Sequence, residues 1–599
     1  MAKDEISKIL DFIFRKNHAK YLLLLFVIAF ILRSIAALNI APNADEMLHA
    51  THAIDIIKAN VLQIMDQDPV WFYMTDIGFR IFGVNMFSGR FLSILFGSLS
   101  IFPLYLLGKE LFNRRIGLIA SVILTFSPFY MNNTLAEMDV AMTFFILLSS
   151  YFFIVSLKKE NYKLLLTAVI FFGIAILVKT IAASFLPAFV IYYIYYLKKN
   201  KIKWLTWKRV IIPILILFIL LTPIFSFNYL LYKDKGIVDV QFSRFLGISP
   251  EVYAGISSTM KPFSVSDLFF TYEDGLHPPG YYEGFRMYWK QGLVTFLLGI
   301  LGFFLAFKKN RSSLLFLSLL FFFPFTFLSG TSLLPYHFVF GIPIFAISGG
   351  LFINWISIKI SKPNKFKVMS VILVLVIFSS FFFMNQWNAF SGKNEITKMF
   401  EFSEENIPDE ALVLVDSRIY RGRIAWLFND KHYLESGQLN SLLETSESLL
   451  DSVPLQQRNP VSVETYFVEC IIDDCGWGNV DAALNQSMEQ TIEFIRNSSR
   501  EVGVVTNNKN DPYFRVYQTK LNLRPITLAL VDQTHVWFYY PVRYKYEEQI
   551  FDKYETHGFF DTALDGFAHL ILYLTILIAL SSILISIFIV YKDYKKQTK

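Results

Sequence analysis

The chain has 599 residues, of which 54% are hydrophobic and 17% charged. Soluble domains usually carry about 25% charged residues, so this composition excludes an ordinary soluble protein and predicts a polytopic α-helical membrane protein. The formal net charge of +6 does not indicate nucleic-acid binding, because the cations gather in short loops between apolar runs, where they set membrane orientation. We therefore expect membrane lipids as partners and no nucleic acid.

Apolar runs long enough to cross a hydrocarbon core of about 30 Å divide most of the chain, and they predict about twelve spans. These runs start near Tyr21, Phe87, Ile116, Val140, Leu164, Ile181, Val210, Gly292, Ser312, Tyr336, Val368 and Gly566. The first run has no small-residue cleavage site after it, so we expect a retained anchor and not a removed signal peptide.

The apolar stretch from Leu164 to Leu197 is interrupted by Lys179. As a single helix it would be about 50 Å long at 1.5 Å per residue, which is too long for one crossing. It would also place a lysine in the middle of the bilayer, at a cost of about 3 kcal/mol. The sequence therefore predicts two short spans with Lys179 at the turn between them.

With that split, the basic loops all fall on one face of the membrane. These loops contain Arg15, Lys16, Lys20, Lys109, Arg114, Arg115, Lys158, Lys159, Lys198, Lys308, Lys359 and the terminal YKDYKKQTK. The positive-inside rule then predicts a multi-pass cell-membrane protein with both termini in the cytoplasm. The acidic residues near positions 45 and 137, and the loops 41–86 and 231–291, are expected on the extracytoplasmic face.

Residues 388–565 differ in character from the rest of the chain. Segments ALVLVDSRIY and REVGVVTNN resemble short buried strands, and IAWLF and SMEQTIEFIRN resemble helices. We therefore predict a transmembrane catalytic region at 1–387, an extracytoplasmic α/β domain at 388–565, and a last transmembrane helix with a basic tail at 566–599. The two cysteines, Cys470 and Cys475, form either a local disulfide or two free thiols.

Two acidic pairs lie at the mouths of spans on the same predicted face. Asp45 and Glu46 follow the first span, and Glu137 and Asp139 precede the fourth. Each pair alone could serve as a helix cap, because carboxylates stabilise the exposed N–H groups of a helix start. The occurrence of two pairs on one face favours a functional site. The aromatic stretch 68–90 between them predicts interfacial helices.

These residues resemble the GT-C fold glycosyltransferases that use lipid-phosphate-linked sugars, in the branch of the protein O-mannosyltransferases and the aminoarabinose transferase of lipid A. The resemblance covers about Met1 to Ser380 and does not extend beyond Asn388. It is carried, in order along the chain, by NADEMLHA, IFGVNMFSGR, LFNRRIGLIASVILTFSPF, AEMDVAMTFF, GIAILVKTIAASFLP, HPPGYYEGFRMYWKQGLVTFLLGILGF and SLLPYHFVFGIPIFAISGG.

The resemblance implies transfer of a sugar, mannose or another hexose, from a polyprenyl or dolichyl phosphate to an acceptor hydroxyl outside the cytoplasm. A phosphate leaving group is already a stable anion, so such an enzyme needs chiefly a base for the acceptor and cations for the phosphate. Asp45 matches the family's first acidic motif and is the predicted base, with Glu46 as its neighbour. The family implies an inverting single displacement without a covalent carboxylate nucleophile. The acceptor is a protein or a cell-envelope glycan.

The second acidic pair is assigned to acceptor or metal binding. Glu137 and Asp139 flank one residue, so on a helix their side chains point in different directions and need separate roles. By resemblance, Glu137 and His277 are candidate ligands for a divalent cation such as Mg, Mn or Zn. The alternative for His277 is a loop histidine that caps a turn.

Lys179 and Arg90 are the candidate ligands of the lipid phosphate. The segment around Lys179 resembles the family, but a lysine at a helix end also commonly extends its amine to the lipid headgroups. Arg90 at the entry of a span has the alternative of an interfacial anchor. Tyr336 and His337 either line the same site or form a buried aromatic pair at a helix start.

Other classes of protein share part of this pattern. A transporter or flippase also has many spans with ionisable residues, but here these residues gather at one face and not near the midplane, and matching half-repeats are not apparent. An oligosaccharyltransferase subunit would carry a WWD motif, which this sequence lacks. A noncatalytic scaffold would not require several acidic motifs.

Overall fold

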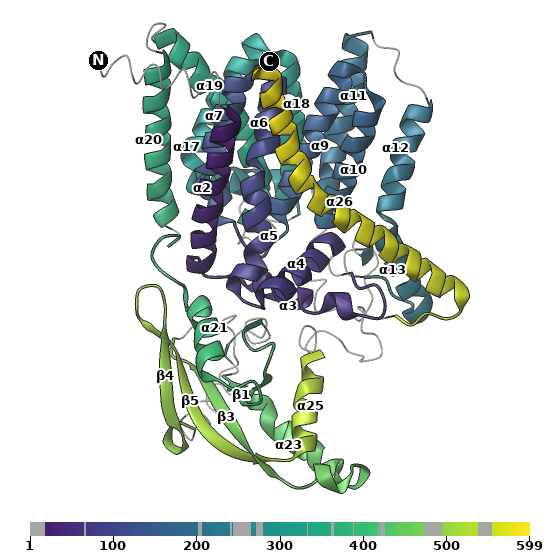
Figure 1. Ribbon diagram of the computed structural model, residues 1–599, viewed down its shortest axis with the longest axis vertical. Helices are drawn as coiled ribbons and strands as arrows, with labels where there is room; N and C mark the ends of the chain where they lie inside the picture. Colours follow the sequence, from purple (N-terminus) through teal and green to yellow (C-terminus); the bar gives the residue numbers. More distant parts are fainter. Residues whose placement is uncertain are drawn as a thin grey trace.

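The computed structural model places a bundle of long helices beside a smaller sheet domain (Figure 1). The structure describes the chain apart from residues 1–17, 65–67, 202–206, 240–241, 244–264, 271–278, 332–333, 361–364, 387, 417, 420–425, 473–492, 494, 537–553 and 599. His277 therefore lies outside the described residues, as do Cys475 and most of the predicted helical segment SMEQTIEFIRN.

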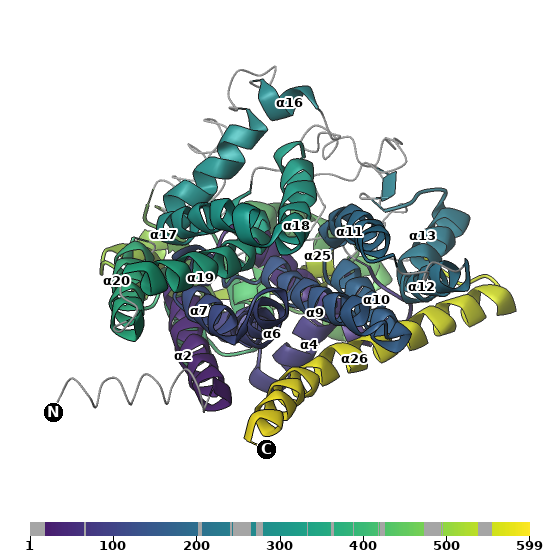
Figure 2. The ribbon, with the colours of Figure 1, turned by 90° about the horizontal axis from the view of Figure 1, so that it is seen from above.

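The bundle consists of apolar helices that run roughly alongside one another (Figures 1 and 2). Its elements are α2 (His18–Asn39), α5 (Met86–Leu99), α6 (Ile101–Leu111), α7 (Arg114–Thr125), α8 (Pro128–Asn132), α9 (Asp139–Lys159), α10 (Tyr162–Val178), η2 (Thr180–Phe185), α11 (Leu186–Lys199), α12 (Trp207–Leu220), α13 (Thr222–Lys235), α17 (Gly280–Lys309), α18 (Arg311–Ser329), η4 (Pro335–Phe340), α19 (Gly341–Ile360), α20 (Lys365–Asn385) and α26 (Phe559–Thr598). The short helices α3 (Ala44–Ala53), η1 (Ile56–Lys58), α4 (Pro69–Phe82) and α16 (Ser266–Phe269) complete it.

The predicted count of about twelve spans is not confirmed. Among the described residues, nine helices are long and apolar enough to cross a membrane, or ten if the pair α12 and α13, bent by 54°, is one span. The difference arises from short helices. Helix α7 has 12 residues and α10 has 17, so at 1.5 Å per residue each is shorter than a hydrocarbon core of about 30 Å.

Two of the predicted apolar runs start inside longer helices. Gly292 lies inside α17, where its backbone (φ −138°, ψ 28°) leaves the helical region and forms a kink between two helical segments. The last helix, α26, begins at Phe559 and not near 566, because its first turns also contain acidic residues. Asp561 there is paired with Lys233 of α13 at 2.7 Å, so polar side chains are accommodated before the apolar run.

The predicted helix break at Lys179 is confirmed. Helix α10 ends at Val178, Lys179 is extended (φ −158°, ψ 124°), and the chain returns through η2 into α11. The rings of Phe172 and Phe189, on the two sides of the break, lie 5.4 Å apart, so the two helices pack as a hairpin. The break places the Lys179 side chain at one end of the bundle.

Close backbone contacts hold the bundle helices together. A Cβ atom on Gly117 of α7 would lie 2.4 Å from the carbonyl oxygen of Tyr105 in α6. A Cβ atom on Gly302 of α17 would lie 1.8 Å from the carbonyl oxygen of Ser348 in α19. Small residues at crossings allow this approach, which is how helices gain packing energy in a lipid environment. A side chain at either glycine would separate the helix pair.

The two ends of the bundle carry different charges, as the sequence predicts. At one end Lys109 is paired with Asp593 of the C-terminal helix at 2.5 Å, and the Lys158 ammonium contacts the carbonyl of Glu110. The acidic motifs and Lys179 gather at the other end, beside α3 and α4 and toward the sheet domain (Figure 1). The charge separation is a structural fact. Which end faces the cytoplasm stays a prediction.

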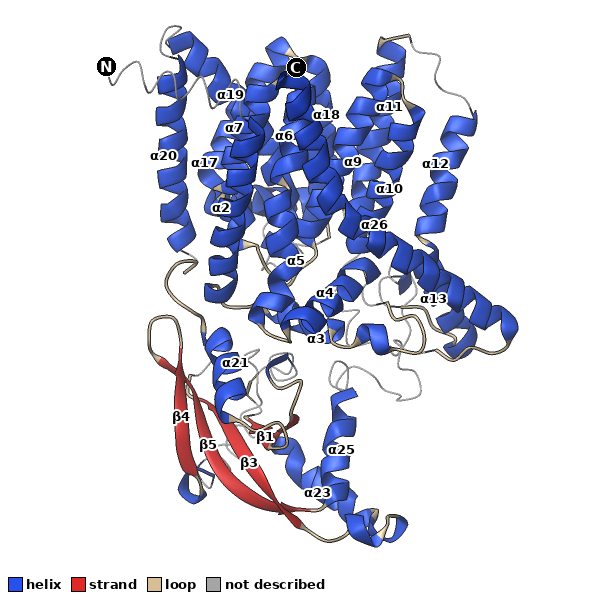
Figure 3. Cartoon of the chain, in the orientation of Figure 1, coloured by secondary structure: helices blue, strands red, loops and turns tan. Residues whose placement is uncertain are grey.

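The sheet domain is a five-stranded mixed sheet with helices packed against it (Figure 3). Its elements are α21 (Glu395–Asn406), β1 (Leu412–Val415), β2 (His432–Glu435), α23 (Leu439–Ser448), β3 (Val461–Cys470), β4 (Arg500–Thr506), β5 (Pro512–Leu523) and α25 (Pro525–Val536). The strand order is β2-β1-β3-β5-β4, with β1 parallel to β2 and β3, and β5 antiparallel to β3 and β4.

Both predicted strands are present in this domain, but only β1 is buried as predicted, because β4 lies at the edge of the sheet and is mostly exposed or half-buried. ALVLVDSRIY supplies β1, the buried strand LVLV, and REVGVVTNN supplies β4. Of IAWLF, only Trp426 and Leu427 are described as helical. Cys470 at the end of β3 is disulfide-bonded, and Cys475 is the one other cysteine in the sequence.

Candidate active site

Charged side chains from several separate parts of the chain meet at the end of the bundle that faces the sheet domain (Figure 1). They come from α3, from α5, from the segment between α8 and α9 and the first residue of α9, from the break between α10 and η2, and from η4. Most of these positions are helix termini or turns, where the main chain leaves the bundle. The cluster therefore lies at the boundary between the apolar bundle and the sheet domain.

Helix α3 fixes the first acidic motif. The Asn43 side chain accepts a hydrogen bond from the Glu46 N–H at 2.7 Å, and the Glu46 carboxylate accepts from the Asn43 N–H at 3.4 Å, which is a capping box. Successive helical residues point about 100° apart, so the neighbours Asp45 and Glu46 enter different environments. Asp45 is partly exposed and accepts a hydrogen bond from the Tyr336 hydroxyl at 2.6 Å.

Glu46 is fully buried in an ion pair with Arg90 of α5. Both Glu46 oxygens accept from the guanidinium, one of them from Arg90 Nη2 at 2.8 Å, and Oε1 also accepts the Ala136 N–H at 2.8 Å. Arg90 Nη1 donates to the carbonyls of Ala37 at 2.6 Å and Ile40 at 2.8 Å. Four N–H groups of Arg90 therefore already have protein partners. The pair ties α2, α3, α5 and the segment before α9 together.

Asp139, Lys179 and His337 form a second buried unit. The Lys179 ammonium donates to Asp139 Oδ2 at 2.7 Å, and His337 Nδ1 lies 3.2 Å from Asp139 Oδ1 and 3.2 Å from the Lys179 ammonium. Burial alone would lower the pKa of Lys179, but the negative charges of Asp139, Glu137 and Asp68 raise that pKa above its usual value. Lys179 is therefore a cation at neutral pH.

Glu137 is buried next to His49 of α3. Its carboxylate Oε2 lies 3.2 Å from His49 Nδ1, and the side chain is 1% exposed. Burial raises the pKa of Glu137 above the usual value of a glutamate, with partial compensation by His49. The Ser93 hydroxyl donates to the Glu137 backbone carbonyl at 3.0 Å and holds this segment against α5.

The structure brings most of the predicted site residues together. Asp45 contacts Tyr336, whose neighbour His337 contacts Asp139 and Lys179, and Glu46 binds the backbone one residue before Glu137. Within the described part of the chain, no group of three or more metal-ligating side chains could hold a metal ion. The predicted partner of Glu137, His277, lies outside the described residues, so that pairing stays a prediction.

Sequence reasoning overlooked His49 and undervalued His337. His49 lies four residues after Asp45, and helical periodicity places residues four apart on one face, so the signal was present. His337 was weighed against a buried aromatic pair with Tyr336. The structure has both features, because the Tyr336 and His337 rings are in edge contact at 4.5 Å while each side chain also contacts a carboxylate.

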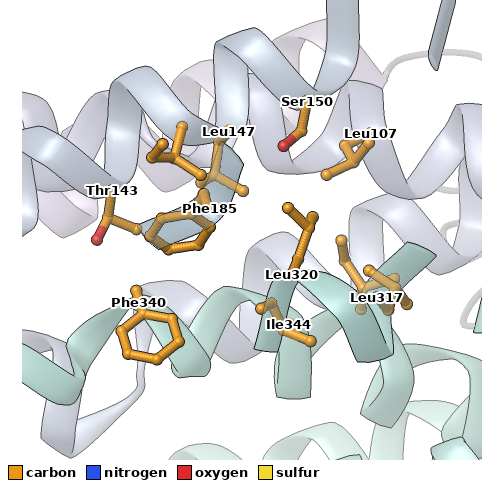
Figure 4. Close-up of a pocket in the computed structure, with 11 residues that line it drawn as sticks. Leu107, Thr143, Leu147, Ser150, Phe185, Leu317, Leu320, Phe340 and Ile344 are labelled. Carbon is orange, nitrogen blue, oxygen red and sulfur yellow. The ribbon is translucent and has the colours of Figure 1, made fainter. Parts of the chain in front are cut away.

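A small cavity lies one helical turn beyond Asp139, inside the bundle (Figure 4). Thr143 lines it and donates its hydroxyl to the Asp139 carbonyl at 2.8 Å. Phe185, Leu320 and Phe340 supply apolar walls. Its volume of about 10 Å³ is the space of a single water molecule, so it is too small to hold a lipid chain.

Solved structures define the class of fold. A crystal structure of ArnT from Cupriavidus metallidurans bound to undecaprenyl phosphate matches with a TM-score of 0.55 at 12% identity, over 84% of this chain and 98% of that chain. The apo structure of the same protein matches with a TM-score of 0.52 at 13% identity, over the same shares. The chain therefore has the GT-C fold. At 12–13% identity these matches concern the fold and not the activity.

Sequence comparisons match parts of the chain. Residues 66–227 match the family described as dolichyl-phosphate-mannose-protein mannosyltransferase. This range contains Arg90, Glu137, Asp139 and Lys179, but not Asp45. An uncharacterised protein of Aquifex aeolicus is 27% identical over 197 residues, which are 33% of this chain and 39% of that protein. The match therefore spans less than half of the relative's length.

Proposed function

We propose that this membrane protein transfers a sugar from a polyprenyl- or dolichyl-phosphate donor to an acceptor hydroxyl, by an inverting single displacement. The observation that carries the proposal is that a partly exposed carboxylate, Asp45, and a buried ammonium, Lys179, both adjoin Tyr336 at one end of a GT-C bundle. Asp45 accepts from the Tyr336 hydroxyl at 2.6 Å, and the Lys179 ammonium lies 5.7 Å from the centre of the Tyr336 ring. A base and a cation are the two groups that this reaction requires.

Asp45 is the proposed base. It is the more accessible member of the first acidic motif, and its hydrogen bond from Tyr336 fixes the position of one carboxylate oxygen. The other oxygen is then the atom that takes the acceptor proton as the acceptor oxygen attacks the anomeric carbon. The bond from that carbon to the phosphate oxygen breaks, and the phosphate leaves with both bonding electrons. A carboxylate nucleophile is not required.

Lys179 is the proposed ligand of the departing phosphate. Asp139 and His337 hold the ammonium in place, and the family motif around this lysine supports the assignment. A preoriented ammonium stabilises the negative charge that grows on the phosphate as the bond breaks. The ArnT structure bound to undecaprenyl phosphate supports a lipid phosphate as the donor class.

Arg90 and Glu46 are assigned to positioning. Because Arg90 is buried and donates to Glu46 and two backbone carbonyls, it supports α3 instead of reaching a ligand. Glu46 in turn holds the segment that carries Glu137. We assign Glu137, with His49, to the acceptor side of the site.

The proposed sugar is mannose or another hexose, and the proposed acceptor is a protein or a cell-envelope glycan. The name of the matching family supports mannose and a protein acceptor. The disulfide-bonded Cys470 supports an extracytoplasmic location of the sheet domain, because disulfides persist in oxidising compartments. The separation of basic and acidic ends supports cytoplasmic termini.

The test is a transfer assay with purified protein in lipid nanodiscs. The protein is incubated with radiolabelled polyprenyl-phosphate mannose or glucose and with peptide or glycan acceptors. We expect transfer from at least one lipid donor, and no transfer when GDP-mannose or UDP-glucose replaces it. Turnover with a nucleotide sugar as the direct donor would overturn the donor assignment.

A further inference from the structure

The C-terminal end of α2 is capped by the sheet domain. The last carbonyls of a helix have no partner inside the helix and must find one elsewhere. The Leu38 carbonyl accepts from the Asn394 N–H at 3.2 Å, from Asn394 Nδ2 at 2.9 Å and from the Thr397 hydroxyl at 2.9 Å. Asn394 Nδ2 also donates to the Ile40 carbonyl at 3.0 Å. The side chain of Asn394 is fully buried.

The same asparagine begins helix α21. Its Oδ1 accepts the N–H groups of Ile396 and Thr397, both at 2.9 Å, which is the arrangement of an N-cap. One amide side chain thus caps two helix ends, the start of α21 with its oxygen and the end of α2 with its nitrogen. In the reverse direction, Asn39 Nδ2 donates to the Ala389 carbonyl at 2.9 Å.

This junction is adjacent to the positioning pair. The Ile40 carbonyl that accepts from Asn394 also accepts from Arg90, which holds Glu46. Asp45 is the next residue to Glu46 and lies five residues after Ile40. A displacement of residues 38–40 therefore moves one of the two backbone carbonyls that bind Arg90, that of Ile40, and the chain that leads into α3.

A second contact joins the sheet domain to the bundle, and here Trp426 packs against α5. Its indole is fully buried, lies 5.5 Å from the Phe400 ring of α21, and covers Gly89 next to Arg90. A Cβ atom on Gly89 would lie 2.6 Å from the Trp426 ring, so the two surfaces meet without space between them. The sheet domain therefore contacts the surroundings of Arg90 at two places. Trp426 covers the neighbouring Gly89, and Asn394 binds the Ile40 carbonyl that also accepts from Arg90.

We propose that Asn394 is a positioning residue of the active site, through which the sheet domain holds the acidic motif of α3 in its reactive position. This role deepens the proposed function and rests on it for its catalytic consequence. Loss of the Nδ2 donor leaves the Leu38 carbonyl with the Asn394 N–H and the Thr397 hydroxyl, and the Ile40 carbonyl with Arg90. Residues 38–40 are then held less firmly and Asp45 is displaced, while Lys179 keeps its partners. A misplacement of about 1 Å lowers turnover by about 100-fold, so we expect kcat to fall between about 10- and 100-fold with donor affinity unchanged.

The test uses Asn394→Asp, which keeps the N-cap oxygen for α21 but has no N–H to donate to Leu38 or Ile40. Asn394→Ser also keeps a capping oxygen and excludes the added charge as the cause. Asn406→Asp is the matched control, because the Asn406 amide donates only to the Phe402 carbonyl within the same helix, at its exposed far end. The measurements are kcat, donor Kd and amide hydrogen exchange of the full-length protein.

We expect faster exchange across residues 37–46 in both Asn394 variants, unchanged exchange in β3 and β5, and no effect of Asn406→Asp. Unchanged exchange at 37–46, or a loss of donor affinity equal to the loss in kcat, would overturn the positioning role. Hydrogen exchange does not require activity. An inactive wild-type protein therefore contradicts the proposed function, while the exchange result alone decides whether Asn394 holds this segment.

Discussion

Two buried ion pairs at the same end of the bundle are built differently. In the pair of Glu46 and Arg90, both side chains are fully buried, and backbone groups of α2 and the segment before α9 occupy the remaining hydrogen-bonding positions. In the pair of Asp139 and Lys179, the third partner is a titratable side chain, His337, and the lysine side chain is 8% exposed. The first pair is closed, which means that only protein groups surround it. The second pair lies beside the proposed active site.

The comparison distinguishes residues that hold the fold together from residues that act on the substrate within one cluster of charges. When one partner of a closed pair is removed, the other charge stays buried without a counter-charge. We therefore expect the loss of such a pair to lower the free energy of unfolding. A pair with a compact ammonium beside a histidine can exchange part of its contacts for a phosphate, so its loss is expected to appear in ligand binding. The same distinction applies to two adjacent residues, because Asp45 is the proposed base and Glu46 is proposed to support the fold.

The largest effect is expected for Asp45→Asn. The amide keeps the size and the hydrogen bond from Tyr336 but cannot take a proton, so transfer should fall by about 1,000-fold or more. The measurement is turnover of the lipid-linked donor, with donor binding and thermal unfolding as controls that should not change. Turnover within about 3-fold of wild type would remove Asp45 from the mechanism.

Glu46→Gln should act chiefly on stability. It leaves the Arg90 guanidinium buried without a carboxylate, and breaking a buried ion pair from one side costs about 3–5 kcal/mol. Denaturant or thermal unfolding in detergent measures this loss, with Glu401→Gln in α21 as the matched control, because the side chains of its pair with Lys393 are about half exposed. A variant as stable as wild type would mean that the closed pair is not a support.

Lys179→Met should weaken donor binding by about 10- to 100-fold, the value of one charge-assisted hydrogen bond. It also leaves Asp139 buried without its cation, so the single variant loses stability. The double variant Lys179→Met/Asp139→Asn removes both charges and should recover stability without recovering affinity. Binding of polyprenyl phosphate measures the first effect. Recovery of affinity in the double variant would show that Lys179 acts only through Asp139.

Asp409→Asn in the sheet domain should have the smallest effect, because Asp409 is exposed although its partner Lys431 is buried. The hydrogen bond and charge of Lys431 lower the pKa of Asp409, so the pair stabilises the folded state above the usual aspartate pKa and loses that contribution as pH falls through the lowered pKa. We expect a fall in Tm of at most about 2 °C at pH 7 that becomes smaller as the pH falls below about 4. A difference that grows on acidification would contradict this sign.

The sequence predicted the features that depend on local pattern. Hydropathy and one interrupting lysine were sufficient to place the break at Lys179, and short apolar runs located β1 and β4. Charge alone predicted that basic and acidic ends would separate. The span count and the start of α26 were less accurate, because short apolar helices and polar first turns are not distinguished by hydropathy.

The partners within the site could not be predicted from spacing. Glu46 and Arg90 are 44 residues apart, and Asp139 and His337 are 198 residues apart, so only the folded bundle decides that they meet. Arg90 was predicted to bind phosphate because an arginine at a helix entry can do so. In the structure the carbonyls of Ala37 and Ile40, at the C-terminal end of α2, accept hydrogen bonds from Arg90, and no local sequence pattern indicates these contacts. Histidine at position 49 was detectable from helical periodicity.

The account depends on the acidic end of the bundle being outside the cytoplasm, and cysteine accessibility tests this most directly. Ala41 is exposed between α2 and α3, and Lys163 is exposed at the basic end. We predict that a membrane-impermeant maleimide labels Ala41→Cys in intact cells, whereas Lys163→Cys is labelled only after permeabilisation. Labelling of Ala41→Cys exclusively from the cytosolic side would contradict the account.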